Sequence, residues 1–439
     1  MIENPMKKLV KAQKEGKAAG IYSCCSANKY VLQAALEQAR DCKCLLLIES
    51  TANQCDQNGG YTGMTPADFR DFVYELADQA DFSRDRIILG GDHLGPLTKV
   101  HLPEKEAMSY AAELVDAYVR AGFAKIHIDT SMKVADDDPD ERLSEQVIAR
   151  RGAALAAVCE EAWKDIKSLN PQAVRPVYVV GSEVPIPGGA QNPDSGMQVT
   201  RPEDFEATVR AFQNAFEEEG LSEAWDNVIA VVVQPGVEEK DAGCTEYDRT
   251  AAQELMAAIK DYDHLIYEGH STDYQTKYKL RELVEDGVGI LKVGPGLTYA
   301  AREGLFALAY MEEADKTIPE GRKSHFIQIL DEAMVKDSKY WGKHYHGNQN
   351  DQAFKRKFSF SDRSRYYMPS PEVEEARERM IANFKEYGIN LATLSQFMPL
   401  QYTKVREGEL DCDAEALIKD KVKYTINEYM YATRQQMLG

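Results

Sequence analysis

The sequence predicts an α/β protein with a (β/α)8 barrel followed by a helical extension. Eight apolar, β-branched runs alternate with helical patterns up to about residue 315. Continuous apolar runs of this kind are typical of parallel strands that are buried on both faces. A doubly wound open sheet would show the same alternation, but eight repeats favour a closed barrel. We therefore assign residues 1–315 to the barrel and residues 316–439, which lack the alternation, to the extension.

The individual elements follow from the apolar periodicity and from helix-capping residues. Thr65-Pro66-Ala67-Asp68 supplies an N-cap, a proline at the first helical position and a capping-box carboxylate, and Gly122 ends a later helix. The predicted strands are 20–26, 44–50, 87–89, 125–129, 177–183, 228–234, 265–270 and 289–293. The predicted barrel helices are 29–40, 65–80, 104–121, 140–167, 200–220, 249–260, one after Asp273, and one from 294 to 313. The predicted helices of the extension are 323–335, 371–387 and 414–437.

The amino-acid composition argues against several classes of binding partner. The net charge of -20 argues against nucleic acid and anionic membranes, since both select basic surfaces. No apolar run reaches the roughly 20 residues of a membrane span, and residues 1–5 contain no signal-peptide core. The eight cysteines lack zinc-ribbon spacing, so we expect reduced thiols in a cytoplasmic protein.

Polar side chains gather at the carboxyl ends of the predicted strands, where (β/α)8 barrels carry their active sites. The amino ends of the same strands show no such convergence. The strand-end residues are Cys25, Ser26, Glu49, Asp92, His93, Asp129, Glu183, Gln234, Glu268, His270 and Gly294. This distribution predicts a site at one mouth of the barrel.

The Asp92-His93 pair, between Gly90-Gly91 and Gly95-Pro96, is the focus of the predicted chemistry. By itself the pair could be a hydrogen-bonded aspartate beside a core histidine. Among so many polar strand ends, we interpret His93 and His270 as ligands of zinc or a similar divalent ion. Glu49, Asp129 and Glu183 would complete coordination or move protons, with Asp92 or Glu183 as the proton carrier. Strand alternation places His127 and Glu268 one layer deeper, in a supporting role.

Two further segments are candidates for binding an anionic group. In barrels, the ends of the last two strands often bind phosphate through backbone N–H groups and a helix amino terminus. Arginines in the aromatic segment 358–367 could reach the site and clamp an anion, although a packed loop with surface arginines explains them equally well. The candidate substrate or phosphate ligands are Ser271, Thr272, Asp273, Lys292, Gly294, Gly296, Arg363 and Arg365.

Several long motifs resemble one known family. They are residues 58–70, 90–96, 269–276, 291–295, 361–363 and 365–367. These motifs resemble the Z-type, so-called non-catalytic subunit family of class II D-tagatose-1,6-bisphosphate aldolase, over the whole chain. The resemblance implies a (β/α)8 barrel related to catalytic class II aldolases, and some relatives are metal-dependent ketose 4-epimerases.

The resemblance also implies roles for individual residues. Asp92 matches the acid/base aspartate of the catalytic aldolases, and His93 and His270 match two of their metal-ligand histidines. A third ligand histidine is expected at the end of the sixth strand, where this chain has Gln234. The amide oxygen of Gln234, or the carboxylate of Glu183, would then replace it as a ligand.

The expected function is that of a tagatose-1,6-bisphosphate aldolase-type subunit in galactitol, tagatose or amino-galactose catabolism. It would support or carry metal-dependent C3–C4 aldol chemistry on a ketohexose phosphate. One alternative is a stand-alone 4-epimerase of a ketohexose or its phosphate, and another is a non-enzymatic sugar-phosphate-binding protein. We expect zinc, with manganese, nickel or cobalt as alternatives. The expected partners are a ketose or ketose phosphate and a catalytic aldolase subunit, in a homo- or hetero-oligomer.

Overall fold

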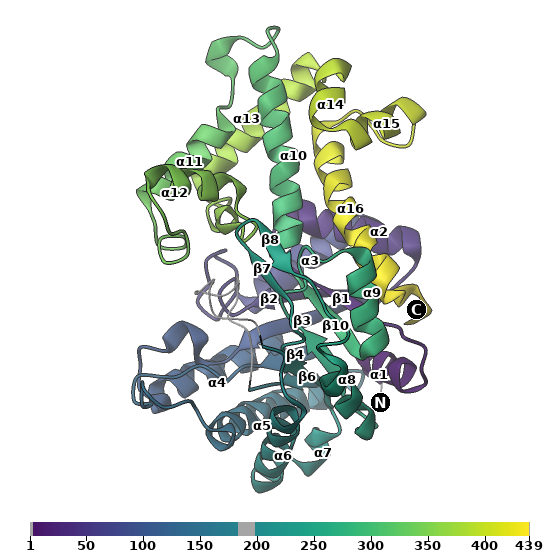
Figure 1. Cartoon of the computed structure of the whole chain (residues 1–439), viewed down its shortest axis with the longest axis vertical. Coiled ribbons are helices and arrows are strands. Elements are labelled where there is room, and N and C mark those ends of the chain that lie inside the picture. Colours follow the sequence, from purple (N-terminus) through teal and green to yellow (C-terminus); the bar gives the residue numbers. More distant parts are fainter. Residues whose placement is uncertain (1–2, 183–197, 439) are drawn as a thin grey trace.

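Eight parallel strands close into a barrel in the computed structural model, which describes residues 3–182 and 198–438 (Figure 1). Around the barrel the strands follow the order β1-β10-β9-β6-β5-β4-β3-β2. Their bounds are β1 Ile21–Cys25, β2 Leu46–Thr51, β3 Ile87–Leu94, β4 Lys125–Ile128, β5 Val177–Val180, β6 Val228–Val233, β9 Ile266–Gly269 and β10 Val288–Val293. The remaining two strands, β7 (Glu238–Lys240) and β8 (Gly243–Thr245), form a hairpin after β6. The predicted (β/α)8 fold is confirmed.

Helices surround the barrel as the capping signals predict. Thr65 and Asp68 form the expected capping box, and Pro66 is the first residue of α3. The bounds are α2 Lys29–Cys42, α3 Pro66–Gln79, α4 Glu104–Arg120, α5 Glu145–Leu169, α6 Pro202–Glu218, α7 Ser222–Trp225, α8 Gln253–Ala258, α9 Lys277–Asp286 and α10 Pro295–Ala314. No helix within the described ranges is long and apolar enough to cross a bilayer.

The amino-terminal mouth of the barrel is closed by apolar side chains. Helix α1 (Met6–Lys14) and the final 3-10 turn (Gln435–Leu438) both pack there, and the two chain ends lie near one another in Figure 1. The apolar cluster comprises Met6, Leu9, Val10, Ala12, Ala19, Ile21, Leu47, Ile88, Val177, Val179, Ile229, Ala230, Val232, Ile266, Ile290 and Leu438. Because this end is filled, a ligand can approach only from the opposite mouth.

The extension rises from the barrel and returns to it. Helix α10 continues away from the barrel and packs against α16, which also packs against α2 and α9 (Figure 1). The bounds are α11 Phe326–Lys336, α12 Gln349–Phe358, α13 Pro371–Tyr387, α14 Leu391–Phe397, α15 Pro399–Glu407 and α16 Ala414–Thr433. Helices α12, α14 and α15 were not predicted, since each is too short to show a clear apolar periodicity. The division at residue 315 stays a prediction.

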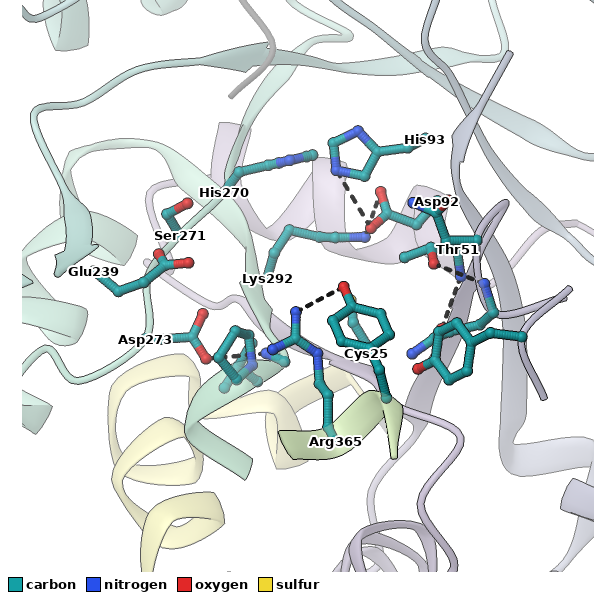
Figure 2. A pocket seen from close by; sticks show the side chains of 17 residues that line it. Cys25, Thr51, Asp92, His93, Glu239, His270, Ser271, Asp273, Lys292 and Arg365 are labelled. Atoms are coloured by element: carbon teal, nitrogen blue, oxygen red, sulfur yellow. Dashed lines mark hydrogen bonds and ion pairs between the residues drawn. The ribbon is translucent and has the colours of Figure 1, made fainter. Parts of the chain in front are cut away.

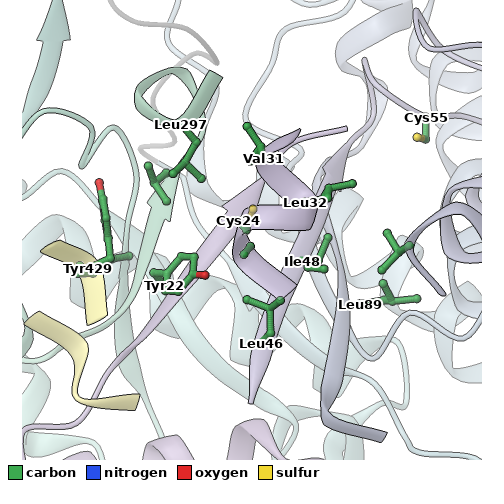
Figure 3. Packing of buried hydrophobic residues seen from close by; sticks show 14 of the residues in the cluster. Tyr22, Cys24, Val31, Leu32, Leu46, Ile48, Cys55, Leu89, Leu297 and Tyr429 are labelled. Atoms are coloured by element: carbon green, nitrogen blue, oxygen red, sulfur yellow. The ribbon is translucent and has the colours of Figure 1, made fainter. Parts of the chain in front are cut away.

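A second apolar cluster lies between the barrel strands and the surrounding helices, and it includes residues of the extension. Figure 3 shows part of it, with Tyr22 and Cys24 of β1, Val31 of α2 and Tyr429 of α16. The Tyr22 and Tyr429 rings lie 6.0 Å apart between centroids. All of these side chains are buried, so α16 is part of the barrel's apolar layer and holds the extension over the site.

Strand β3 is longer than its sequence indicates, and this difference shapes the site. We expected the strand to end at Leu89, but pairing with β2 continues to Asp92, which lies opposite Thr51. Gly90 permits this pairing, because a Cβ there would lie 2.5 Å from Glu49 Oε1. Asp92 and His93 are therefore strand residues whose side chains are held by the barrel.

Candidate active site

Three buried histidine rings meet at the carboxyl-terminal mouth of the barrel. His93 comes from β3, His127 from β4 and His270 directly follows β9. Their ring centroids lie 5.1 Å apart for His93 and His127, 4.9 Å for His93 and His270, and 5.0 Å for His127 and His270. The rings meet edge to face, so the three imidazoles form one cluster. His127, which we had placed one layer deeper, is a full member of it.

Each imidazole has a carboxylate on one of its two nitrogens. His93 Nδ1 lies 2.9 Å from Asp129 Oδ2, and His127 Nδ1 lies 2.9 Å from Asp92 Oδ1. His270 Nε2 lies 2.9 Å from Glu268 Oε1. Such carboxylate contacts fix the ring orientation and leave the second nitrogen of each ring for another partner.

Four side chains of this site, including two of the histidines, are close enough together to hold a divalent metal ion. His127 Nε2 is buried and has no hydrogen-bond partner among residues 3–182 and 198–438, which is costly unless a ligand satisfies it. One donor atom each from Asp92, His127, Glu268 and His270 lie within 4.8 Å of one another. Imidazoles that are backed by carboxylates are the donor set that zinc and neighbouring transition ions prefer.

The two residues expected to replace a third histidine do not enter this cluster. Gln234 Oε1 accepts hydrogen bonds from the backbone N–H groups of Gly236, at 2.8 Å, and Val237, at 2.9 Å. Its side chain therefore stabilises the turn after β6, and it would have to lose both bonds to reach a metal. Glu183 lies outside the described residues. The third imidazole of the structure is His127, from a different strand.

A layer of buried ion pairs lies directly below the histidines. Lys125 Nζ lies 2.6 Å from Glu49 Oε1 and 2.6 Å from Glu268 Oε2. Lys292 pairs with Glu49 and lies 2.9 Å from Asp92 Oδ1. Glu49 thus contacts two lysines and fixes the position of both. Within the barrel, the order is an apolar plug, then the charged layer, then the imidazoles.

The backbone at His93 has an unusual conformation. Its φ of +50° lies in the left-handed region, and the pairing of β3 with β4 shifts register between Gly91 and Leu94. Beyond it, Gly95 approaches β4 so closely that a Cβ would lie 1.7 Å from the Asp129 carbonyl oxygen. Strained backbone of this kind concentrates at functional sites, and here it turns the His93 ring toward His127.

A cavity of about 90 Å³ opens above the histidines (Figure 2). Arg365 and Tyr366 line it from the extension, and Figure 2 shows Arg365 reaching in beside the side chains of the barrel mouth. The lining residues are Cys25, Thr51, Asn53, Gln54, Tyr61, Asp92, His93, Glu239, His270, Ser271, Asp273, Lys292, Val293, Gly294, Pro295, Arg365 and Tyr366.

A family model and one solved structure resemble this chain over nearly its whole length. Residues 6–434 match the model described as D-tagatose-1,6-bisphosphate aldolase subunit GatZ/KbaZ-like. The chain belongs to the GatZ/KbaZ-like family. It also resembles the crystal structure of a probable tagatose 6 phosphate kinase from Sinorhizobium meliloti 1021, with 40% identity and a TM-score of 0.83. That match covers 94% of this chain and 100% of the other.

A more distant match is a fructose-bisphosphate aldolase structure from Campylobacter jejuni. It is 16% identical with a TM-score of 0.43, and it covers 88% of this chain and 96% of the other. Membership in the GatZ/KbaZ-like family assigns the chain to an aldolase-subunit type and to carbohydrate metabolism. The resemblance noted from the sequence motifs is confirmed.

The predicted anion ligands of this GatZ/KbaZ-like chain divide into two groups. Ser271, Asp273, Lys292, Gly294 and Arg365 line the cavity. Thr272, Gly296 and Arg363 are not among the residues that line it. The Thr272 hydroxyl donates to the Lys292 carbonyl oxygen, the Gly296 N–H donates to Asp273, and Arg363 Nη2 donates to His344. Sequence reasoning missed Glu239 and Tyr61, which carry no strand-end signal because they lie in loops and in the β7–β8 hairpin.

His344 provides a pH test of the segment that carries Arg365. Its Nδ1 accepts a hydrogen bond from Arg363 Nη2 at 3.1 Å, and burial together with Arg363 and Arg365 lowers the pKa of His344 to about 4. The neutral ring is therefore favoured in the folded state. The contribution of neutral His344 to the free energy of unfolding is complete above the unfolded pKa of about 6.5. It is lost as the pH falls toward 4.

We expect His344→Gln, which keeps an acceptor but cannot titrate, to lose less stability than the parent chain between pH 7 and pH 4.5. Urea unfolding midpoints at the two pH values measure the difference. Equal losses in both proteins would show that His344 does not titrate in this range.

Proposed function

We propose that this chain carries metal-dependent aldol chemistry at the C3–C4 bond of a ketohexose or ketohexose phosphate, as a tagatose-bisphosphate aldolase-type subunit. The supporting observation is the cluster of three buried imidazoles, each with a carboxylate on one nitrogen, at the floor of a cavity. Asp92, Lys292 and Arg365 line that same cavity, so acid/base and charged groups surround any bound sugar.

His127 and His270 are the residues that would hold the ion, with Asp92 or Glu268 as an oxygen donor. His93, whose ring centroid lies 4.9 Å from that of His270, is a further candidate ligand. Zinc suits this donor set best, and manganese, nickel and cobalt are alternatives. When bound, a divalent ion supplies Lewis-acid polarisation of the sugar's C2 carbonyl. Asp129 and Glu268 hold the rings of His93 and His270 in orientation, and the barrel backbone keeps all of these groups rigid.

Asp92 is the residue that would move the proton. It lines the cavity, and Lys292 and His127 both contact its Oδ1, so it stays ionised and able to accept. In the cleavage direction, Asp92 takes the proton of the C4 hydroxyl as the C3–C4 bond breaks. The bonding electrons pass through C3 to the C2 oxygen, giving an enediolate and an aldehyde. In the reverse direction, the same carboxyl group returns the proton.

A stand-alone 4-epimerase is the second candidate, and Tyr366 is the observation that favours it. Epimerisation needs the aldehyde to turn over and add again on its other face, which calls for a second proton-handling group. Tyr366 lines the cavity from the extension, and Arg365 Nη2 donates to its hydroxyl at 3.0 Å. Although burial opposes it, the charges of Arg365 and Arg363 lower the pKa of the Tyr366 phenol.

The test is turnover by the purified chain after reloading with zinc. Tagatose, tagatose 6-phosphate and tagatose 1,6-bisphosphate are each incubated with it, alone and after co-expression with a class II aldolase subunit, and products are separated by chromatography. Triose products indicate an aldolase, and a C4 epimer indicates an epimerase. Failure to change any rate or product, alone or with the partner, would overturn the proposal and leave a binding protein.

Asp92→Asn provides the mechanistic prediction. We expect turnover to fall by about 10²- to 10⁴-fold, the usual contribution of a general acid/base group. Metal content, measured by elemental analysis, should stay the same, because the amide keeps an oxygen near His127. Asp263→Asn, an exposed residue before β9, is the matched control and should retain full turnover. Unchanged turnover in Asp92→Asn would remove Asp92 from the mechanism.

A further inference from the structure

The carboxyl group of Asp273 is held at the cavity wall by one of its two oxygens. Oδ1 accepts hydrogen bonds from the backbone N–H groups of Gly294, at 3.0 Å, and Gly296, at 2.7 Å. Asp273 is only 2% exposed and lines the cavity, and its Oδ2 makes no hydrogen bond among residues 3–182 and 198–438. The amino end of helix α10 therefore fixes the orientation of this group and leaves Oδ2 for another partner.

A second buried carboxyl group lies beside Asp273. Glu239, in the β7–β8 hairpin, is only 4% exposed, and its Oε2 has no hydrogen-bond partner within the described part of the chain. Figure 2 shows the side chains of Glu239 and Asp273 next to one another, beside Ser271. Two carboxylates in these positions repel one another, and each can only accept hydrogen bonds. A proton held between them removes the repulsion and supplies a donor.

The groups around Asp273 allow it to hold and release a proton near neutral pH. Burial and Glu239 raise the pKa of Asp273 to about 7, although the backbone donors of α10 and the charge of Arg365 oppose this rise. Burial also raises the pKa of each other titratable neighbour, so these side chains are uncharged near pH 7: Cys244, Tyr274 and Tyr429. Glu239 and Arg365 are therefore the charged groups that set the protonation of Asp273.

Asp273 and Asp92 face the cavity from opposite sides of the barrel. Asp92 belongs to β3 and Asp273 follows β9, and three strands separate β3 from β9 in either direction around the closed sheet. Figure 2 likewise shows the two side chains on opposite sides of the cavity. Lys292 lies 2.9 Å from Asp92 Oδ1 and favours its ionised form, whereas Glu239 favours the protonated form of Asp273. The cavity thus has a base on one side and an acid on the other.

Aldol cleavage needs a second proton transfer, for which Asp92 does not account. Asp92 takes the proton of the C4 hydroxyl as the C3–C4 bond breaks, and an enediolate remains. Before a triose can leave, C3 of the enediolate must receive a proton while the C2 oxygen re-forms its carbonyl. An epimerase, by contrast, needs no proton at C3. The group that supplies this proton is therefore specific to the aldolase reaction.

We propose that Asp273 is the acid that protonates C3 of the enediolate, and that Glu239 is the positioning residue that keeps the proton on Asp273. This inference rests on the proposed function, since it completes the cleavage at the same site. The Asp273 O–H bond breaks as the electron pair of the C2–C3 double bond forms the new C3–H bond. Asp273 is left as a carboxylate and Asp92 carries the proton from the C4 hydroxyl, so exchange with water restores both groups.

Hydrogen exchange at C3 in D2O tests the inference with the zinc-loaded full chain. In the reverse direction, ionised Asp273 removes a C3 proton from dihydroxyacetone or dihydroxyacetone phosphate and returns a deuteron, which NMR detects. We expect Asp273→Asn, which keeps the Oδ1 acceptor for α10, to exchange about 10²- to 10⁴-fold more slowly than the parent. Glu246→Gln, which changes an exposed glutamate outside the cavity lining, should exchange at the parent rate.

An added oxidant separates a missing acid from a damaged site. Two hexacyanoferrate(III) ions each accept one electron from the enediolate and oxidise it, so that no proton at C3 is needed. With this oxidant, Asp273→Asn should release the aldehyde from tagatose 6-phosphate or tagatose 1,6-bisphosphate at a rate close to that of the parent. Asp92→Asn should not be rescued, because it lacks the first proton transfer.

Glu239→Gln tests the positioning role. Loss of the neighbouring negative charge lowers the pKa of Asp273, so exchange, which needs the carboxylate, should reach its plateau at lower pH than in the parent. An unchanged pH profile would remove Glu239 from the proposal. If the parent cleaves ketohexose phosphates but Asp273→Asn exchanges at the parent rate, or is not rescued by the oxidant, the inference alone is overturned. A parent chain that neither cleaves nor exchanges would overturn the proposed function itself.

Discussion

Replacing His127 by alanine is expected to weaken zinc binding by more than about 100-fold, since changes to residues that merely orient a ligand already cost about 10- to 100-fold. The reason is that His127 Nε2 is buried, unpartnered in the described chain and surrounded by the other donors. Competition with a chromophoric chelator measures the affinity, and elemental analysis measures the metal retained after purification.

Two variants control this experiment. His264→Ala removes another histidine whose Nε2 is buried without a hydrogen-bond partner in the described chain, but it lies just before β9, near Trp225 and away from the cavity lining. It should keep full zinc affinity. Gln234→Ala removes the residue that the sequence favoured as a replacement ligand, and it should also keep the metal. Loss of zinc in Gln234→Ala, with retention in His127→Ala, would reverse the assignment of the third ligand.

The position of the site was predictable because strand order and strand direction determine it. In a parallel barrel all strands carry their carboxyl ends to one mouth, so Glu49, Asp92 and His270 could be brought together without knowing any distance. Alternation along one strand also places His127 correctly on the inner face of β4. These inferences need only one strand at a time, and the structure agrees with each of them.

The depth of His127 within the barrel was not predictable, because it depends on the register between β3 and β4. Counting along β4 alone puts His127 two residues below Asp129, and therefore one layer deeper. In the structure, the irregularity of β3 between Gly91 and Leu94 alters its pairing with β4, and the backbone nitrogen of His93 lies 3.1 Å from His127 Nδ1. A register shift of this kind brings both rings to the same level, and neither strand's sequence reveals it.

The anion site shows a different limit of sequence reasoning. The helix amino terminus after β10 exists as expected, but position alone says nothing about which group its N–H groups already bind. Asp273 lies three residues beyond His270 in the preceding loop, and only the folded geometry brings it to Gly294 and Gly296. Burial and the neighbouring Glu239 also raise the pKa of Asp273 to about 7, which no sequence pattern indicates.

Replacing Lys125 by methionine is expected to cost about 3–5 kcal/mol in the free energy of unfolding, the range for removing one partner of a buried ion pair. Lys125 is fully buried and is shared between Glu49 and Glu268, at 2.6 Å from each. Urea unfolding at pH 7 measures the loss. Lys279→Met, which breaks an ion pair with Glu282 near the surface, should change the free energy of unfolding by no more than about 1 kcal/mol.

The pH dependence of Lys125→Met identifies the cause of the loss. In the parent chain burial opposes ionisation, but Lys125 and His270 lower the pKa of Glu268 to about 2. The contribution of ionised Glu268 to the free energy of unfolding is complete above the unfolded pKa of about 4.3. It is lost only as the pH falls toward 2. Without Lys125, burial raises the pKa of Glu268, so the stability deficit should be larger at pH 8 than at pH 5. A deficit independent of pH would point to lost packing rather than to unpaired buried charge. Adding Glu268→Gln to Lys125→Met should then restore part of the stability, because Glu49 still pairs with Lys292 and Glu268 no longer carries a buried charge that has lost its lysine.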